Sequence, residues 1–104
     1  MVKHTCYDLS KLNGGEVAEV TLVGNAANVR AMTRKDYQLY LAGKPFKFFG
    51  GLAMQSPYCI TIPSKAHWFL TVDMQGLSGT VISTVQVINP KNGNVVIPAN
   101  VVVQ

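Results

Sequence analysis

Charged residues are scarce in this 104-residue sequence. Only 13% of the residues are charged, about half the usual share of roughly 25%, whereas 48% are hydrophobic. This apolar content excludes an intrinsically disordered chain, because burying it can offset the entropy lost on folding. With so few charged residues, part of the surface must be apolar, which favours an interface with a partner or an oligomer.

Signals of export and of membrane insertion are also missing. No run of about 18 apolar residues occurs, so no transmembrane helix is predicted. The start, MVKHTCYDLSKL, has no apolar segment and carries an acid early, which is not typical of a secretory signal. We therefore expect a cytoplasmic protein that does not enter a membrane.

The two cysteines, Cys6 and Cys59, lack the C-x-x-C spacing of zinc and redox sites. We expect them to be reduced, buried thiols, and a disulfide between them would require a location outside the cytosol. Two histidines 63 positions apart, His4 and His67, are a weak start for a metal site, so no metal is predicted. No G-x-G-x-x-G or P-loop pattern occurs, and no cofactor is predicted.

The hydrophobic pattern repeats every second residue, which is typical of β-strands. We predict one all-β domain over residues 1–104, built as an antiparallel sandwich or jelly-roll-like fold of seven to eight strands. The expected strands are VKHTCYDL (2–9), EVAEVTLVG (16–24), NVRAMT (28–33), FKFFGGLAM (46–54), PYCITIP (57–63), AHWFLTVDMQ (66–75), GTVISTVQVIN (79–89) and VVIPANVVVQ (95–104).

One short helix is expected near residues 34–42. Thr33 and Asp36 have the spacing of a capping box, with Asp in place of the preferred Glu, and Gly43 stands where a glycine often ends a helix. A single helix of two turns excludes a repeated β-α-β arrangement.

The stretch SKAHWFLTVDMQG (64–76) contains the only tryptophan. In a strand, Trp68 shares an apolar face with Leu70, Val72 and Met74, so we expect it in the core. His67 and Asp73 share the other face but lie about 20 Å apart along the strand, too far for a hydrogen bond. We interpret His67 as a structural or rim residue. A general base is the alternative, although no G-x-S-x-G motif supplies a nucleophile.

A segment upstream combines cations with aromatic side chains. Five of the nine lysines and arginines fall within residues 30–47, and five of the nine aromatics fall within residues 37–49. Cations attract phosphate and aromatic faces stack on bases, so this mixture suits a nucleotide or a single-stranded nucleic acid. The net charge of +4 agrees with an anionic partner. The candidate ligand-binding residues are Arg34, Lys35, Tyr37, Lys47, Phe49 and His67.

An ordinary amphipathic strand is the alternative interpretation of KPFKFFGG (44–51). Its alternation would place Phe46 and Phe48 inside, with Lys47 and Phe49 outside. In the same way, GNAAN (24–28) and the glycine pair at 50–51 either offer backbone N–H groups to an anion or only satisfy turn geometry.

The C-terminal segment carries no charge after Lys91 and is rich in valine. Such a segment is prone to aggregation if it forms an exposed edge strand, and Pro98 is its one feature that weakens edge pairing. We predict that a strand within residues 93–103 pairs with a second copy of the chain.

Three motifs in order resemble a known bacterial family. EVAEVTLVGNAANVRAM, FFGGLA and HWFLTVDMQGLSGTV are similar to the domain of unknown function DUF1883, over roughly residues 3–88. The resemblance implies a small all-β bacterial protein, and fusion of some members to TIR domains would suggest a sensing or recognition module. It implies no activity, cofactor or catalytic residue. The positions that match the family pattern are Gly15, Gly24, Asn25, Asn28, Tyr37, Gly50, Gly51, His67, Trp68, Asp73, Gly76 and Gly79.

Three hypotheses follow. The first is a non-catalytic binding or interaction module, for which an anionic ligand such as a nucleotide or nucleic acid is the candidate. The second is a hydrolase-like enzyme with His67 as general base, and the third is a structural subunit that forms homo-oligomers.

Overall fold

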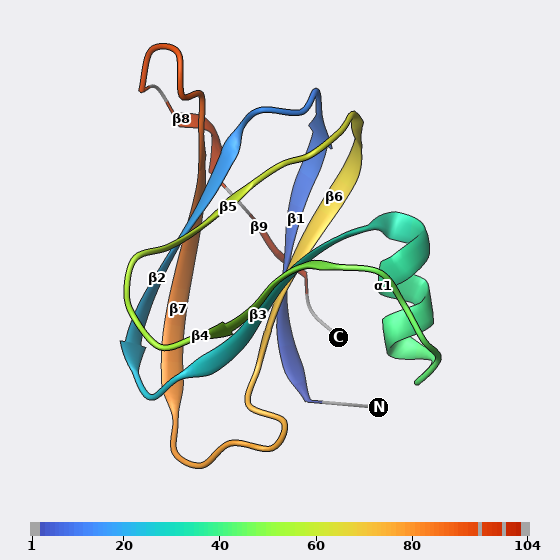
Figure 1. The fold of residues 1–104 in the computed structure, drawn as a ribbon, viewed down its shortest axis with the longest axis vertical. Coiled ribbons are helices and arrows are strands. Elements are labelled where there is room, and N and C mark those ends of the chain that lie inside the picture. The colour runs from blue at the N-terminus through green and yellow to red at the C-terminus, as the bar shows by residue number, and fades with distance from the viewer. Residues whose placement is uncertain (1–2, 94, 99, 103–104) are drawn as a thin grey trace.

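The computed structural model describes residues 3–93, 95–98 and 100–102, which form two facing antiparallel sheets and one short helix (Figure 1). In chain order the elements are β1 (His4–Leu12), β2 (Val17–Gly24), β3 (Ala27–Thr33), α1 (Arg34–Leu41), β4 (Phe49–Ala53), β5 (Tyr58–Thr61), β6 (Ala66–Asp73), β7 (Val81–Ile88), β8 (Val95–Pro98) and β9 (Asn100–Val102).

One sheet has the strand order β4-β3-β6-β1-β9 and the other has the order β5-β2-β7-β8. Every strand pair is antiparallel. The predicted antiparallel sandwich with one short helix is therefore confirmed. Strands number nine in the described residues because the C-terminal segment divides, with β8 pairing with β7 and β9 with β1. Positions 94, 99, 103 and 104 of the segment in which this strand was predicted lie outside the described residues.

The main core fills the space between the sheets. Its members include Leu9, Val20, Trp68 and Leu70, each at most 1% exposed. The Trp68 indole N–H donates to the carbonyl of Ser64 at 2.9 Å, so its polar atom is satisfied despite burial. The predicted strand over this segment and the inward-facing tryptophan are both confirmed.

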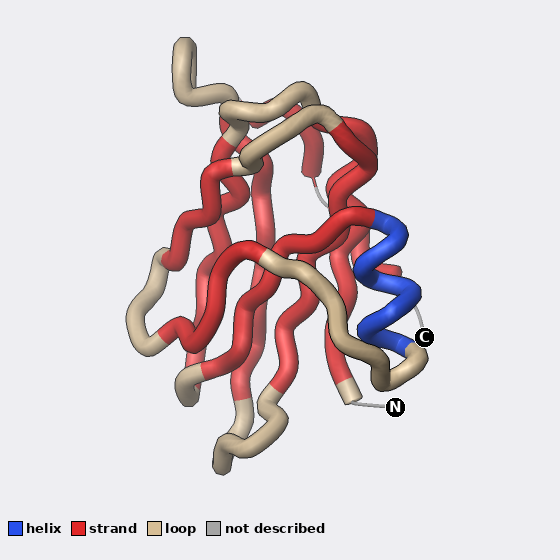
Figure 2. The backbone as a smooth tube through the Cα atoms, turned by 45° about the vertical axis from the view of Figure 1, so that its right-hand side comes forward, coloured by secondary structure: helices blue, strands red, loops and turns tan. Residues whose placement is uncertain are grey.

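Helix α1 covers the outer face of the five-stranded sheet, as the rotated view in Figure 2 shows. A second apolar cluster fills the space between the helix and that sheet. Strand β6 contributes to both cores and is buried continuously from Trp68 to Asp73. The members of the second cluster are Cys6, Met32, Tyr37, Tyr40 and Phe69.

A β-bulge in β1 changes the predicted end of that strand. Asp8 pairs with Phe69 and Ser10 pairs with Trp68, which leaves Leu9 as the extra residue, and Ser10 has a φ of 65°. The insertion shifts the alternation, so that Leu12 as well as Leu9 reaches the main core. The prediction that this strand ends at Leu9 was wrong because a simple alternating pattern does not allow for the bulge. Val2 of that prediction lies outside the described residues.

The helix begins and ends where its capping residues predict. Thr33 is the N-cap, and its hydroxyl donates to the Asp36 carboxylate at 3.1 Å instead of capping a backbone N–H. At the other end Gly43 has a φ of 71° and its N–H donates to the Tyr40 carbonyl, as in a glycine-terminated helix.

Candidate functional site

The predicted cations gather at the first turn of α1. Arg34 and Lys35 open the helix and are exposed. The backbone N–H of Lys47 donates to the Asp36 carboxylate at 3.1 Å, which holds the segment before β4 against this turn. These contacts bring together cations that are 13 positions apart in the sequence.

Phe49 lies at the same end of the five-stranded sheet. Its ring packs edge-on against Trp68 with centroids 5.8 Å apart, yet 47% of the residue remains exposed. Trp68 pairs with Thr33, so His67 lies level with Arg34 at the start of the helix. Four of the six candidate residues lie at this end of the sheet, in a region that we call the basic edge: Arg34, Lys35, Lys47 and Phe49. His67 does not join them, because its ring stacks on Phe69 under the helix, on the face of the sheet opposite Phe49.

Tyr37, the sixth candidate residue, faces the interior. It is 6% exposed, its ring stacks on Phe69 at 5.0 Å, and its hydroxyl lies 3.1 Å from Nε2 of His4. Burial and a hydrogen bond with the Cys6 thiol raise the pKa of Tyr37. The residue packs the helix against the sheet and does not face a ligand at the basic edge.

Phe48 departs from the predicted alternation. It was expected inside, but it is 42% exposed, and the guanidinium carbon of Arg30 lies 5.1 Å from its ring centroid. Phe46 is the residue that packs against the helix cluster, with its ring centroid 5.1 Å from that of Tyr40. Because Phe48 precedes β4 and contacts Arg30, while Phe49 contacts Trp68, the two exposed rings lie on opposite sides of the edge strand.

His67 has an acidic partner that its own strand does not supply. Its Nε2 lies 2.7 Å from Oδ1 of Asp8 on the neighbouring strand β1, and its ring stacks on Phe69. The sequence pattern allowed only Asp73 of the same strand to be considered as a partner, and it missed Asp8 because that residue belongs to the paired strand β1. The same Asp8 oxygen accepts the N–H of Ser10, so the bulge places the carboxylate at the imidazole.

Within the described residues, no serine, threonine or cysteine side chain forms a hydrogen bond with the His67 imidazole. His67 forms its one hydrogen bond among the described residues with Asp8. Cys6 lies elsewhere under the helix, and burial raises the pKa of its thiol to about 11, which keeps it protonated at neutral pH. Cys59 was expected to be buried, but it is exposed on strand β5, and both thiols are free.

Every acidic side chain of the sequence is engaged in an internal hydrogen bond. Burial acts to raise the pKa of Glu16, but the N–H groups of Asn13 and Gly14 donate to its carboxylate and lower the pKa overall. Glu19 accepts from Gln86 at 2.7 Å. The remaining three acids are Asp8, Asp36 and Asp73, each with the partners given in this section.

Few cations, by contrast, have an acidic partner. All nine lysines and arginines belong to the described residues, and Arg30 is the one among them that forms an ion pair with an acidic side chain. The other eight are without such a pair, and four of them lie within residues 34–47. The surface around the basic edge is therefore positive.

Asp73 is the centre of a buried polar network that was not predicted. Its Oδ2 accepts from Arg30 at 3.0 Å and from the Tyr40 hydroxyl at 2.8 Å, while its Oδ1 accepts from the Asn28 side chain at 2.7 Å and from the Gln75 N–H at 3.1 Å. Burial, followed by the hydrogen bond to Asp73, raises the pKa of Tyr40. A signal was present in the sequence, since an acid ending an apolar strand must find donors when it is buried.

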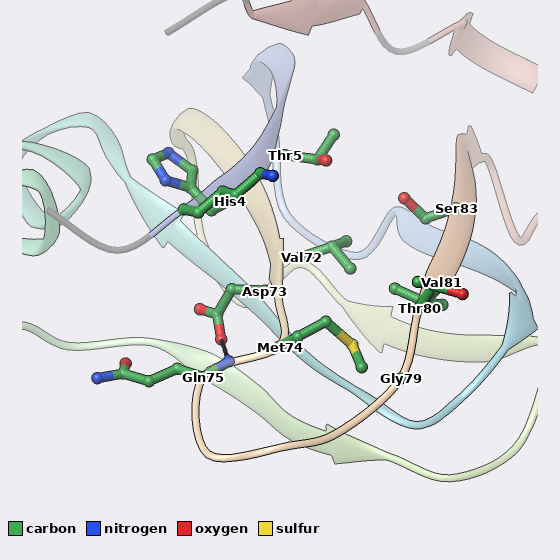
Figure 3. Close-up of a pocket in the computed structure, with 11 residues that line it drawn as sticks. His4, Thr5, Val72, Asp73, Met74, Gln75, Gly79, Thr80, Val81 and Ser83 are labelled. Atoms are coloured by element: carbon green, nitrogen blue, oxygen red, sulfur yellow. Dashed lines mark hydrogen bonds between the residues drawn. The ribbon is translucent and has the colours of Figure 1, made fainter.

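A pocket of about 640 Å³ opens at the end of the sandwich near Asp73. Figure 3 shows its walls, with the start of β1 and the end of β6 on one side and the start of β7 on the other. The lining residues of this end pocket include Lys3, Thr5, Met74 and Val81. None of the residues of the basic edge lines it.

Neither a metal site nor a membrane-spanning helix is found in the part of the chain that the structure describes. No group of three or more histidine, cysteine, aspartate or glutamate side chains converges there as a metal site would require. None of the described helices has the length and apolar character needed to cross a membrane.

The comparisons with known proteins give one finding. A family model described as "Domain of unknown function (DUF1883)" matches residues 2–91. No curated protein and no solved structure matches the chain significantly.

Proposed function

Because this chain belongs to the DUF1883 family of domains of unknown function, we propose its function from the chemistry of its own surface. We propose that it is a non-catalytic recognition module that binds an anionic ligand carrying stackable rings at the basic edge. Single-stranded nucleic acid fits this description best, because it offers a phosphate beside every base.

One observation carries this proposal. The acids of the chain are engaged internally, so cations around α1 and β4 are left without acidic partners. An anionic partner can supply the charge that the protein does not, and complementary charge also speeds association.

The exposed rings add the second element of recognition. Phe48 directly precedes the outermost strand β4 and Phe49 begins it, and these residues are 42% and 47% exposed. Both follow Lys47 in the sequence. A base that stacks on an aromatic side chain contributes about 1–3 kcal/mol regardless of its identity. Bases inside a duplex are already stacked on each other, so the proposal favours a single strand over a duplex.

The test is a fluorescence anisotropy titration with a labelled 12-nucleotide single strand and the corresponding duplex. The double variant Lys47→Ala with Phe49→Ala is expected to bind the single strand at least about tenfold more weakly, since it removes one phosphate contact and one stacking platform. Its matched control is Lys91→Ala with Ile82→Ala, which also removes one exposed lysine and one exposed apolar side chain.

The control pair lies away from the basic edge, on the β7–β8 turn and on the outer face of β7, and should bind as the wild type does. Equal losses in both double variants, or no binding of the wild type to either oligonucleotide at low salt, would refute the proposal.

We further propose that the chain acts in the bacterial cytoplasm. Cys59 is an exposed free thiol, which persists in a reducing compartment but tends to be oxidised outside the cell. Fractionation of a bacterium that expresses the protein should recover it with cytosolic markers, and recovery from the periplasm would contradict this.

Self-association is a second proposed property, favoured by the positions of β8 and β9. Each is the end strand of its sheet, and the sequence around them carries no charge after Lys91. Such edges can pair with a second copy of the chain. Light scattering over a range of concentrations should detect a dimer or larger species, and a monomer at the highest concentration would contradict the idea.

A further inference from the structure

We infer that the end pocket is a second ligand site, separate from the basic edge, and that it takes a small organic anion with a flat apolar body. Its volume of about 640 Å³ falls within the range of roughly 300–1,000 Å³ that small-molecule sites occupy. The inference does not depend on the function proposed for the basic edge.

The connection between β6 and β7 keeps the pocket open. β6 ends at Asp73 and β7 begins at Val81, and the intervening chain loops beyond the end of the sandwich (Figure 1). The space between the sheets is therefore open at this end. Val72, Met74 and Val81 supply its apolar surface (Figure 3).

Hydrogen bonds hold this loop in place at both ends. The Gln75 N–H donates to Asp73, and the Leu77 N–H donates to the carbonyl of Met74 at 2.8 Å. At the far end the Thr80 N–H donates to the Asn25 side chain at 2.9 Å. The walls are thus held in position before a ligand arrives, which lowers the entropy cost of binding.

The loop also depends on a glycine. Gly79 has a φ of 100°, and a Cβ at that position would overlap the side chain of Asn25. The close approach of Asn25 therefore requires glycine there, and this contact fixes the start of β7 at the pocket wall.

The charges around the pocket favour an anion. Lys3 lines it and forms no ion pair with any described acidic side chain. Asp73 is the one acid among the lining residues, but its side chain is fully buried and both oxygens are occupied by donors. Its charge is already balanced by Arg30, so it does not repel an anion in the pocket.

Hydroxyl groups complete the lining. Thr5, Thr80 and Ser83 stand around the pocket, and the Ser83 hydroxyl is engaged with the Tyr7 hydroxyl at 2.8 Å. A few polar groups over an apolar floor orient a ligand that has one charged end and one apolar ring. An aromatic carboxylate has this chemistry.

The experiment compares 2-naphthoate with its neutral analogue 2-naphthamide, by titration of the full chain followed by amide ¹H–¹⁵N chemical shifts. Naphthoate is expected to shift the amides of Thr5, Met74, Thr80 and Val81, and to bind at least about tenfold more tightly than naphthamide because of the positive charge of Lys3. Equal affinity for both probes, or no shifts at millimolar naphthoate, would overturn the inference.

Single and double variants test the role of Lys3 in the end pocket and distinguish binding there from binding at the basic edge. Lys3→Glu should weaken naphthoate binding by about tenfold or more, and Lys3→Gln by less, whereas Lys91→Glu makes the same charge reversal away from the pocket and should have little effect. The variant Lys47→Ala with Phe49→Ala should bind naphthoate like the wild type. If naphthoate instead shifts the amides of Phe48 and Phe49 and this variant loses it, the probe binds the basic edge and the end pocket is not a site.

Discussion

At the scale of the residue, the acids of this chain serve its structure. Asp73 joins β3, α1 and the loop after β6, Asp36 joins α1 to the segment before β4, and Asp8 joins the bulge to His67. A buried carboxylate with four donors is costly to disturb, because its removal leaves those donors unpaired. The cations, with one exception, have no such role.

Replacing Asp73 by asparagine should therefore destabilise the fold strongly. The Asp73→Asn variant removes the charge opposite Arg30 and places an amide donor among existing donors, so the free energy of unfolding should fall by about 3 kcal/mol. Urea denaturation followed by tryptophan fluorescence measures this. Asp36→Asn is the matched control, and it should cost no more than about 1 kcal/mol because its partners are neutral groups near the surface. Equal effects of the two substitutions would contradict the central role of Asp73.

The Glu16 carboxylate gives a prediction about pH. Its pKa is lower in the folded state than in the unfolded chain, so it stabilises the fold above the unfolded pKa, and this contribution is lost as the pH falls through the folded pKa. Unfolding measured from about pH 6 down to about pH 3 should show a smaller loss of stability for Glu16→Gln than for the wild type. Parallel curves for the two proteins would show that Glu16 contributes nothing to acid sensitivity.

The sequence predicted well which way a side chain faces where this depends on the alternation within one strand. Alternation within a strand placed Trp68 inside, and this prediction was confirmed. It placed Phe49 outside, and the residue is 47% exposed, but its ring contacts Trp68 on the core-facing side of the sheet. It failed for Phe48 and for the partner of His67. In these cases the outcome depends on Arg30 and Asp8, which belong to neighbouring strands, and on a bulge that one strand's pattern does not specify.

At the scale of the element, β4 is the part on which the basic edge depends. It is the outermost strand of its sheet and pairs with β3, with Arg30 opposite Gly50. Gly50 has a φ of 117°, and a Cβ there would overlap the carbonyl oxygen of Val29. The carbonyl belongs to β3 and cannot move without disturbing the strand pair.

Two glycine substitutions distinguish the cost of this steric clash from the cost of a positive φ alone. Gly43 also has a positive φ, of 71°, but a Cβ there meets open space. Gly43→Ala should cost about 1–2 kcal/mol of unfolding free energy, the usual cost of a left-handed backbone. Gly50→Ala should cost clearly more, about 3 kcal/mol or above, because it adds a clash with the backbone. Thermal or urea unfolding of both variants is the measurement, and equal losses would show that β4 is free to shift.

Elements were more predictable than their boundaries. The helix was expected near 34–42 and runs over Arg34–Leu41, because its capping signals are local. The C-terminal segment was expected to be one strand, yet β8 and β9 belong to different sheets. Its high valine content does not indicate where the chain crosses from one sheet to the other.

At the scale of the whole molecule, the order of the strands in the two sheets places the residues of the basic edge and of the end pocket together. The basic edge needs β3, α1, β4 and β6 as neighbours, and the end pocket needs β1, β6 and β7. The sequence indicated the first site because its residues are close along the chain. It gave no sign of the second, whose residues come from 3–5, 72–75 and 79–83.

The surplus of unpaired cations around β4 and α1 is tested most directly by the salt dependence of binding to a single-stranded oligonucleotide. A plot of log affinity against log salt concentration should be linear, and each phosphate contact adds about 0.7 to its slope. We predict that Lys47→Ala reduces the slope by about 0.7, while Lys91→Ala leaves it unchanged. Identical slopes for wild type, Lys47→Ala and Lys91→Ala, or an affinity that does not depend on salt, would contradict the account.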